Sequence, residues 1–329
     1  MKLEVPHYIR VPASVGNVGP GFDALGLALQ FHLTVFVEPA SEWQVTVEGE
    51  SVEDLAADET NRVVQMARLA AERWKVQLPP LRVEIFNEIP VQRGLGGSGA
   101  SALAGFALAS LFRRAQTQTQ DYLNLAAEVE GHLDNVAASL LGGLVACYYA
   151  SDGRLYALSG RVPRPVHVLS LWPPWKMETA KMRRVLPETY PRDVVVRQLQ
   201  RVTAILAYWQ EHDDVPPKDF FYDEVHQPYR LEKMPEVRRV IDLASSMGLP
   251  ALLSGAGPAV AVLTTDAAAA TALLERLARE RTYRSWSWRF VRVDRRGLVV
   301  RPYRPLMKKR LLEAIQTSRP VTDTKVPAA

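Results

Sequence analysis

The stretch PVQRGLGGSGASALAG at residues 90–105 decides the fold of this chain. Glycines stand at 94, 96, 97 and 99, the strand-forming Val83 and Ile85 come before them, and an alanine- and leucine-rich helical pattern follows. Glycine lets backbone N–H groups approach a ligand closely, and the first turn of a helix adds unpaired N–H donors and a positive dipole end. The stretch therefore predicts an anion site that suits phosphate. A strand-to-helix turn without a ligand is the alternative.

The loop differs from the common phosphate-binding motifs. A Walker A loop needs a Lys followed by Ser or Thr after its last Gly, and no Lys lies between Lys75 and Lys176. We also expect no Rossmann-type dinucleotide site, because we take the glycine spacing to differ from G-x-G-x-x-G.

The run from Pro90 to Ala100 instead resembles the P-x-x-x-G-L-G-S-S-A-A phosphate loop of the GHMP small-molecule kinases. Gly97 stands where the family has its first Ser, Gly99 stands where it has its first Ala, and Ser98 keeps the second hydroxyl. Each extra glycine should cost about 0.5–1 kcal/mol in conformational entropy and make the loop more flexible.

Three further segments resemble motifs of the homoserine kinases within this family. They are VPASVGNVGPGFDALGLAL at 11–29, EGHLDNVAASLLGG at 130–143 and LSGAGPAVAVL at 253–263. Departures from the family pattern fall at Val15, Gly16, Val18, Leu133 and Ala138. Four matches in the family's order, within a resemblance that covers roughly residues 5–305, identify the chain as a member of the GHMP kinase family.

The resemblance implies an α+β fold with two domains, and strands and helices mixed without strict β-α-β alternation favour the same class. We expect an N-terminal domain at 1–160 that is like domain 2 of ribosomal protein S5 and carries the phosphate loop. We expect a ferredoxin-like C-terminal domain at 161–310 and a polar tail at 311–329. Periodicity predicts strands at 5–11, 33–37, 43–47, 144–149, 166–172, 250–254, 259–264 and 286–293, and helices at 61–74, 98–115, 121–130, 193–210, 235–248 and 267–281.

By resemblance, ATP is the nucleotide and the loop holds its triphosphate. The loop residues are Pro90, Val91, Gln92, Arg93, Gly94, Leu95, Gly96, Gly97, Ser98, Gly99 and Ala100. The Ser98 hydroxyl would approach Mg²⁺ or the β- and γ-phosphates. Mg²⁺ keeps waters and phosphate oxygens as ligands, so one carboxylate is sufficient. Glu130 is the candidate, with Glu128 as a rival.

The resemblance also places catalytic and substrate-binding roles in the segment after Glu130. Asp134 would lie beside the acceptor hydroxyl, either as the general base or only orienting the substrate. Asn135 would contact the substrate as well, although an Asp-Asn turn cap describes the two residues equally well. His132 would be a structural or substrate-orienting donor.

The implied acceptor is an amino acid with a side-chain hydroxyl, namely L-homoserine. Asn17 and Asp23 would bind its ammonium group, and Arg183 and Arg230 its carboxylate, because a guanidinium pairs bidentately with a carboxylate. Arg184 is an alternative to Arg183 because the alignment could slip by one residue. The backbone of Gly255 and Gly257 would lie against the substrate or the phosphate loop, with a tight turn between strands as the competing reading.

The reaction implied by the resemblance is ATP-dependent phosphorylation of L-homoserine to O-phospho-L-homoserine in threonine synthesis. Two rivals remain. One is a GHMP kinase for another small alcohol, such as threonine. The other is a catalytically silent ligand sensor or nucleic-acid binder on the same fold. The resemblance also suggests a homodimer.

Composition fits a cytoplasmic globular protein without a membrane or nucleic-acid partner. The 329 residues are 47% hydrophobic, and no apolar run reaches the length of a membrane span. The net charge of +4 comes from scattered basic residues, and the start of the chain lacks the apolar core of a signal peptide. Cys147 is the single cysteine and reads as a packed thiol. Trp286, Trp288 and Phe290 fit one face of a strand better than a base-stacking surface.

Overall fold

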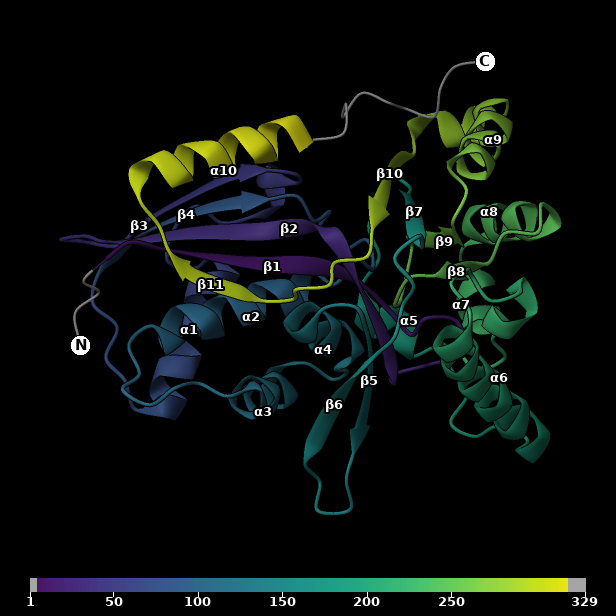
Figure 1. Cartoon of the computed structure of the whole chain (residues 1–329), viewed down its shortest axis with the longest axis horizontal. Coiled ribbons are helices and arrows are strands. Elements are labelled where there is room, and N and C mark those ends of the chain that lie inside the picture. The colour runs from purple at the N-terminus through teal and green to yellow at the C-terminus, as the bar shows by residue number, and fades with distance from the viewer. Residues whose placement is uncertain (1–4, 319–329) are drawn as a thin grey trace.

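The computed structural model describes residues 5–318. Within that range the strands form two separate sheets (Figure 1). The first sheet has the order β11-β1-β2-β4-β3, and β5 and β6 extend it from one end of β2. Its strands are β1 (His7–Gly16), β2 (Leu25–Pro39), β3 (Gln44–Gly49), β4 (Leu81–Asn87), β5 (Leu144–Tyr149), β6 (Leu155–Gly160) and β11 (Val299–Pro302). All of its pairings are antiparallel except β3 with β4.

Helices cover both faces of this sheet. Four lie on one face, with α10 on the other (Figure 1). The four are α1 (Arg62–Trp74), α2 (Gly97–Ser110), α3 (Thr119–Val129) and α4 (Asp134–Leu141), and α10 spans Pro305–Ser318. Helix α2 is apolar on nearly every side because it is buried between the sheet and the neighbouring helices. This burial anchors the phosphate loop at the start of α2 to the main core.

The second sheet has the order β10-β7-β9-β8 and is antiparallel throughout. Its strands are β7 (His167–Trp172), β8 (Ala251–Leu253), β9 (Val260–Thr264) and β10 (Ser287–Arg292). Around it lie α5 (Thr179–Arg183), α6 (Arg192–Glu211), α7 (Gln227–Leu231), α8 (Pro235–Ser246) and α9 (Ala267–Ala278), with short 3-10 turns at Val52–Asp54, Lys218–Phe221 and Arg281–Ser285. The turn between β8 and β9 carries the Ser-Gly-Ala-Gly-Pro motif toward the first sheet.

The α+β class and the two-domain architecture expected from the sequence are confirmed. Strand β1 is longer than expected because it continues through Pro12, where its pairing register with β2 shifts. A proline in a strand normally signals its end, except at a bulge. The prediction also missed α4, which begins at Asp134 where a turn cap was the alternative, and it missed β6 and β11.

The expected polar tail at 311–329 is wrong over residues 311–318, which continue α10. The helix persists there because Leu311, Leu312 and Ile315 pack on the aromatic Tyr8 and Phe36 of the first sheet. Residues 319–329 lie outside the described range. Since β11 pairs with β1, residues assigned to the C-terminal domain also return to the first sheet. The boundary at residue 160 remains a prediction.

The expectation that the glycine spacing of the loop differs from G-x-G-x-x-G is wrong. Gly94, Gly96 and Gly99 do have the G-x-G-x-x-G spacing of a dinucleotide loop, so spacing alone does not exclude one. The topology differs from the Rossmann arrangement, because the strand that follows α2 and its neighbouring helices is β5, which pairs antiparallel with β2.

Candidate active site

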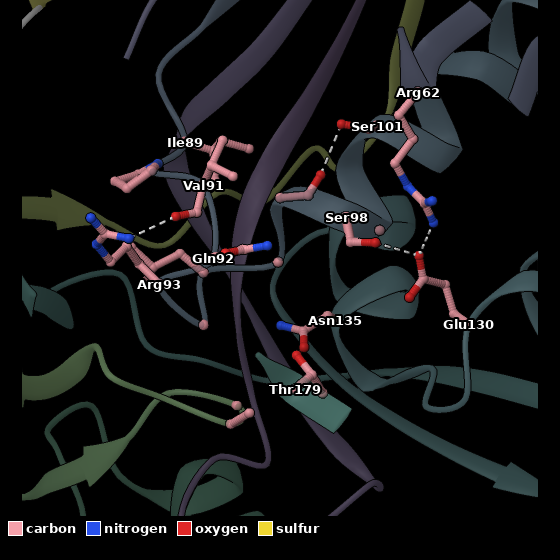
Figure 2. A pocket seen from close by; sticks show the side chains of 18 of the residues that line it. Arg62, Ile89, Val91, Gln92, Arg93, Ser98, Ser101, Glu130, Asn135 and Thr179 are labelled. Atoms are coloured by element: carbon pink, nitrogen blue, oxygen red, sulfur yellow. Dashed lines mark hydrogen bonds and ion pairs between the residues drawn. The ribbon is translucent and has the colours of Figure 1, made fainter. Parts of the chain in front are cut away.

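A cavity of about 640 Å³ lies where four segments meet. They are the phosphate loop, the motifs at 11–29 and 253–263, and the start of α4. Its walls come from segments far apart in the chain, and Figure 2 shows part of this lining. The predicted site residues that line it are Pro90 to Gly99, Asn17, Asp23, Glu130, His132, Asp134, Asn135, Arg183, Arg230 and Gly255. Ala100, Gly257, Glu128 and Arg184 are not among the lining residues.

The glycines of the phosphate loop are required by close backbone approaches on both sides. Gly94 has a φ of +80°, and a side chain there would collide with the carbonyl of Ser254. Gly96 has a φ of +74°, and its Cβ would collide with the Ser14 hydroxyl. The Ser14 N–H also donates to the Leu95 carbonyl over 3.1 Å. The loop is therefore held between β1 and the β8–β9 turn, with the first turn of α2 behind it.

The Ser-Gly-Ala-Gly-Pro motif at 254–258 supports this loop from the second sheet. The Ser254 hydroxyl donates to the Gly94 carbonyl over 2.7 Å, and the Ala259 N–H donates to the Arg93 carbonyl over 2.9 Å. Gly257 does not line the cavity, but its backbone lies directly against Gly94. Gly255 lines the cavity, and its N–H donates to the Gly16 carbonyl over 3.1 Å. This motif is thus both a tight turn between β8 and β9 and a support that holds the phosphate loop through hydrogen bonds.

Ser98, Glu130 and Arg62 form one cluster at the start of α2 (Figure 2). The Ser98 hydroxyl and Arg62 Nη2 each donate to Glu130 Oε1 over 2.7 Å. Glu128 instead accepts from Arg73 over 2.8 Å on the exposed surface. Of the two glutamates proposed from the sequence, only Glu130 is therefore beside Ser98.

Asp134 is buried, and both of its carboxylate oxygens accept backbone hydrogen bonds. Oδ2 accepts from the Asn17 N–H over 2.7 Å and Oδ1 from the Asn135 N–H over 2.9 Å. His132 Nδ1 lies 3.7 Å from Oδ1, and the nearby carboxylate raises the pKa of His132. The Asn135 side chain lines the cavity and donates to the Ser14 carbonyl and hydroxyl, each over 3.1 Å.

Asn17 and Asp23 adopt left-handed backbone conformations with φ of +71° and +54°. The Asn17 side chain bridges two segments, because its amide donates to the Gly255 carbonyl over 3.0 Å and its oxygen accepts from the Asp23 N–H over 3.1 Å. Asp23 forms a bidentate ion pair with Arg183, with contacts of 2.8–3.0 Å. Asp23 and Arg183 are predicted to bind opposite ends of a substrate, but here they pair with each other.

Arg230 is only 2% exposed, and none of the ion pairs among the described residues includes it. Its guanidinium donates to the Gly255 carbonyl over 2.8 Å, to the Met182 carbonyl over 3.3 Å and to His226 Nδ1 over 3.3 Å. Burial lowers its pKa to about 10. A buried cation without a carboxylate partner is costly, so an anionic ligand in the cavity would compensate it.

Arg93 belongs to the loop, but its side chain serves a different purpose. The guanidinium donates to the Pro173 carbonyl and the Val91 carbonyl, each over 3.0 Å, and also to the Pro174 carbonyl. Arg93 therefore attaches the segment after β7 to the loop, and its charge is turned away from the anion site (Figure 2).

Sequence reasoning missed several residues around the cavity. Arg62 had no motif signal beyond its place at the start of a predicted helix, whose cap is the Asn61 side chain. His226 and Phe22 support the arginines, because the Phe22 ring stacks on His226 and lies 5.3 Å from the Arg230 guanidinium. Phe22 stands inside the motif at 11–29, so its position was visible but its contacts were not, and His226 lies four residues before the predicted Arg230.

The remaining candidates are structural. Cys147 is buried in β5, and burial raises the pKa of its thiol to about 12, as expected for a packed thiol. Trp286 and its neighbours belong to the second core at β10, which confirms the strand interpretation. Among the described residues, no helix has the length and apolarity needed to cross a membrane.

Comparison with known proteins matches both halves of the chain. The model for the GHMP kinases N terminal domain matches residues 61–143, and the model for the GHMP kinases C terminal matches residues 211–283. A homoserine kinase of Staphylococcus saprophyticus is 34% identical over 78% of this chain and 85% of its own length. A homoserine kinase of Bacillus velezensis is 36% identical over 80% of this chain and 85% of its own length.

A solved structure agrees with these matches at the level of the fold. The crystal structure of homoserine kinase from Cytophaga hutchinsonii superposes with a TM-score of 0.76 at 24% identity. The superposition covers 92% of this chain and 99% of that one.

Proposed function

Because this chain belongs to the GHMP kinase family and its curated relatives include homoserine kinases, we propose that it transfers the γ-phosphoryl group of ATP to the side-chain hydroxyl of L-homoserine. The product is O-phospho-L-homoserine, and the reaction is a step of threonine biosynthesis. One observation carries the proposal: the glycine loop and the buried Arg230, which belongs to no ion pair among the described residues, line the same cavity.

The two ends of the cavity suit the two substrates. Phosphoryl transfer asks the protein mainly for positioning and for neutralisation of charge. The loop and the first turn of α2 offer backbone N–H donors to the triphosphate. Arg230 supplies the cation for the substrate carboxylate, and Asp23 and Asn17 supply the oxygens for its ammonium group.

Asp134 orients the acceptor hydroxyl in this proposal. Both of its oxygens already accept backbone N–H groups from Asn17 and Asn135, and this holds the carboxylate in one position. A lone pair of each oxygen remains for the substrate hydroxyl. The same geometry permits proton transfer to Asp134, which would make it the general base.

The cluster at α2 fits a magnesium ion. The Ser98 hydroxyl and the Glu130 carboxylate are hard oxygen donors 2.7 Å apart, and Mg²⁺ takes few protein ligands beside water and phosphate oxygens. Bound with the nucleotide, the ion would neutralise phosphate charge. Glu130 would have to exchange its contact with Arg62 for the metal.

The test is an acceptor panel with labelled ATP, covering L-homoserine, L-threonine, L-serine and alcohols that lack the α-amino acid group. We expect the highest kcat/KM for L-homoserine and a phosphorylated product of matching mass. A preference for L-threonine would support the rival GHMP kinase. A preference for an alcohol without the α-amino acid group would refute the assignment. Asp134→Asn with near-normal kcat would exclude an obligatory base at that position.

A further inference from the structure

The cavity has few positive charges near the phosphate loop. Within residues 5–318 its lining includes no lysine and four arginines, namely Arg62, Arg93, Arg183 and Arg230. Three of these are engaged away from the loop's amides. Arg93 is held by three carbonyls, Arg183 is paired with Asp23, and Arg230 lies beside Gly255. Arg62 is the cation beside Ser98, at the start of α2.

Arg62 reaches the cavity from the first position of α1 (Figure 2). Its Nη2 donates to Glu130 Oε1 over 2.7 Å, and this oxygen also accepts the Ser98 hydroxyl. Its Nε is buried without a hydrogen-bond partner among the described residues. The guanidinium therefore has one anchored end and an unused donor next to the group expected to contact the phosphates.

We infer that Arg62 is the phosphate-binding cation of this site, alternating between Glu130 in the free enzyme and the nucleotide's phosphate oxygens in the complex. The inference rests on the proposed function and adds a residue to it. A nucleotide triphosphate carries several negative charges, and backbone amides alone bring only partial positive charge. A guanidinium matches phosphate oxygens with two parallel donors, which is the geometry that Arg62 can offer.

The exchange also serves Glu130. In the free enzyme, Arg62 neutralises this carboxylate, so the start of α2 does not carry an uncompensated negative charge. When phosphate oxygens take the guanidinium, Glu130 is released for other contacts. The pair of Arg62 with Glu130 and the pair of Arg62 with the phosphate oxygens use the same guanidinium and therefore compete. Binding of the nucleotide is thus coupled to release of the Glu130 carboxylate.

A purely structural ion pair is the competing explanation, and the chain contains a matched control. Arg73 lies at the other end of α1 and pairs with Glu128 over 2.8 Å at the surface, away from the cavity. Both pairs connect α1 to α3 or to the residue that follows it. A structural role predicts similar effects for the two arginines.

The experiment measures ADP binding by calorimetry without divalent metal, in chelator, for the wild-type enzyme, Arg62→Met, Arg62→Lys and Arg73→Met. We expect Arg62→Met to raise the Kd for ADP about tenfold or more, the effect of one lost charge-assisted hydrogen bond. Arg62→Lys should recover part of the affinity. Arg73→Met should stay within about twofold, as a surface pair does. In turnover, Arg62→Met should raise the KM for ATP and leave the KM for homoserine unchanged.

Two results would overturn the inference. One is equal ADP affinity for Arg62→Met and Arg73→Met. The other is weaker metal-free ADP binding in Glu130→Gln, because release of Arg62 should make that binding tighter. Urea denaturation of each variant separates loss of folding from loss of contact. If Arg62 governs ADP affinity but homoserine is not phosphorylated, the proposed function fails and the inference about Arg62 stands.

Discussion

At the scale of single residues, Arg230 combines a structural cost with a functional use. It is buried with carbonyl and imidazole partners, and no ion pair among the described residues compensates it. We expect Arg230→Ala to raise the KM for homoserine by about 100-fold, the scale of a lost bidentate contact to a carboxylate. The KM for ATP should change little. Steady-state kinetics with each substrate varied in turn provides the measurement, and an equal rise in both constants would indicate a structural role.

His132 gives a prediction in pH. The Asp134 carboxylate, 3.7 Å away, raises the pKa of the folded imidazole above its ordinary value of about 6.5. The group therefore stabilises the fold fully below the unfolded pKa, and this contribution is lost as pH rises through the folded pKa. His132→Gln should lower the urea midpoint more at about pH 5.5 than at about pH 8.5. The same loss at both pH values would show that protonation of His132 is not involved.

At the scale of elements, the first turn of α2 explains how the chain tolerates its two extra glycines. A Cβ at Gly97 would meet only Ile89 Cγ2 at 3.5 Å, an ordinary contact. A Cβ at Gly99 would meet Val136 Cγ2 at 2.8 Å, and this β-branched side chain cannot easily move. The close packing of α4 against α2 therefore requires glycine at position 99. Gly97 is not required by packing and only increases the conformational freedom of the loop.

The matched pair of Gly97→Ala and Gly99→Ala tests this difference. Both changes remove glycine from the same helical turn. We expect Gly97→Ala to stabilise the protein by about 0.5–1 kcal/mol through lower entropy of the unfolded chain. Gly99→Ala should give no gain or a loss because of the clash with Val136. Equal gains in urea denaturation would contradict the proposed packing between α2 and α4.

At the scale of the whole molecule, the two sheets share one core. The main apolar cluster includes Ile9 and Val35 of the first sheet together with Val168 and Leu263 of the second. Hydrogen bonds from the β8–β9 turn to the phosphate loop join the same parts. A shared core couples their unfolding, so the two parts should not melt independently.

Unfolding measured by two probes tests this coupling. Five of the seven tryptophans lie between residues 172 and 288, so tryptophan fluorescence reports mainly on the part with the second sheet. Far-UV circular dichroism reports on all helices and strands. We expect coincident urea transitions, and a shared shift to higher urea when ADP is present, because ligand binding stabilises the folded state. Separate midpoints would show that the sheets unfold as independent units.

The sequence by itself determined the features that depend on neighbouring residues. The glycine loop, the helix behind it and the order of the four motifs could be read directly, and they predicted the fold class, the family and about half of the cavity lining. Local backbone chemistry explains this success: a glycine with positive φ or a helix start is encoded within a few residues. Gly94 and Gly96 are examples, since each is needed where another backbone or side chain approaches.

Only the tertiary structure decided which distant residues meet. It paired Arg62 with Glu130, and Asp23 with Arg183, and within residues 5–318 it gave Arg230 no carboxylate as an ion-pair partner. It also returned β11 to the first sheet beside β1. These outcomes depend on the path of the chain through space, because side chains far apart in sequence interact only after packing of the core has brought their elements together. A motif can therefore indicate that a residue matters, while its partner is set by the fold.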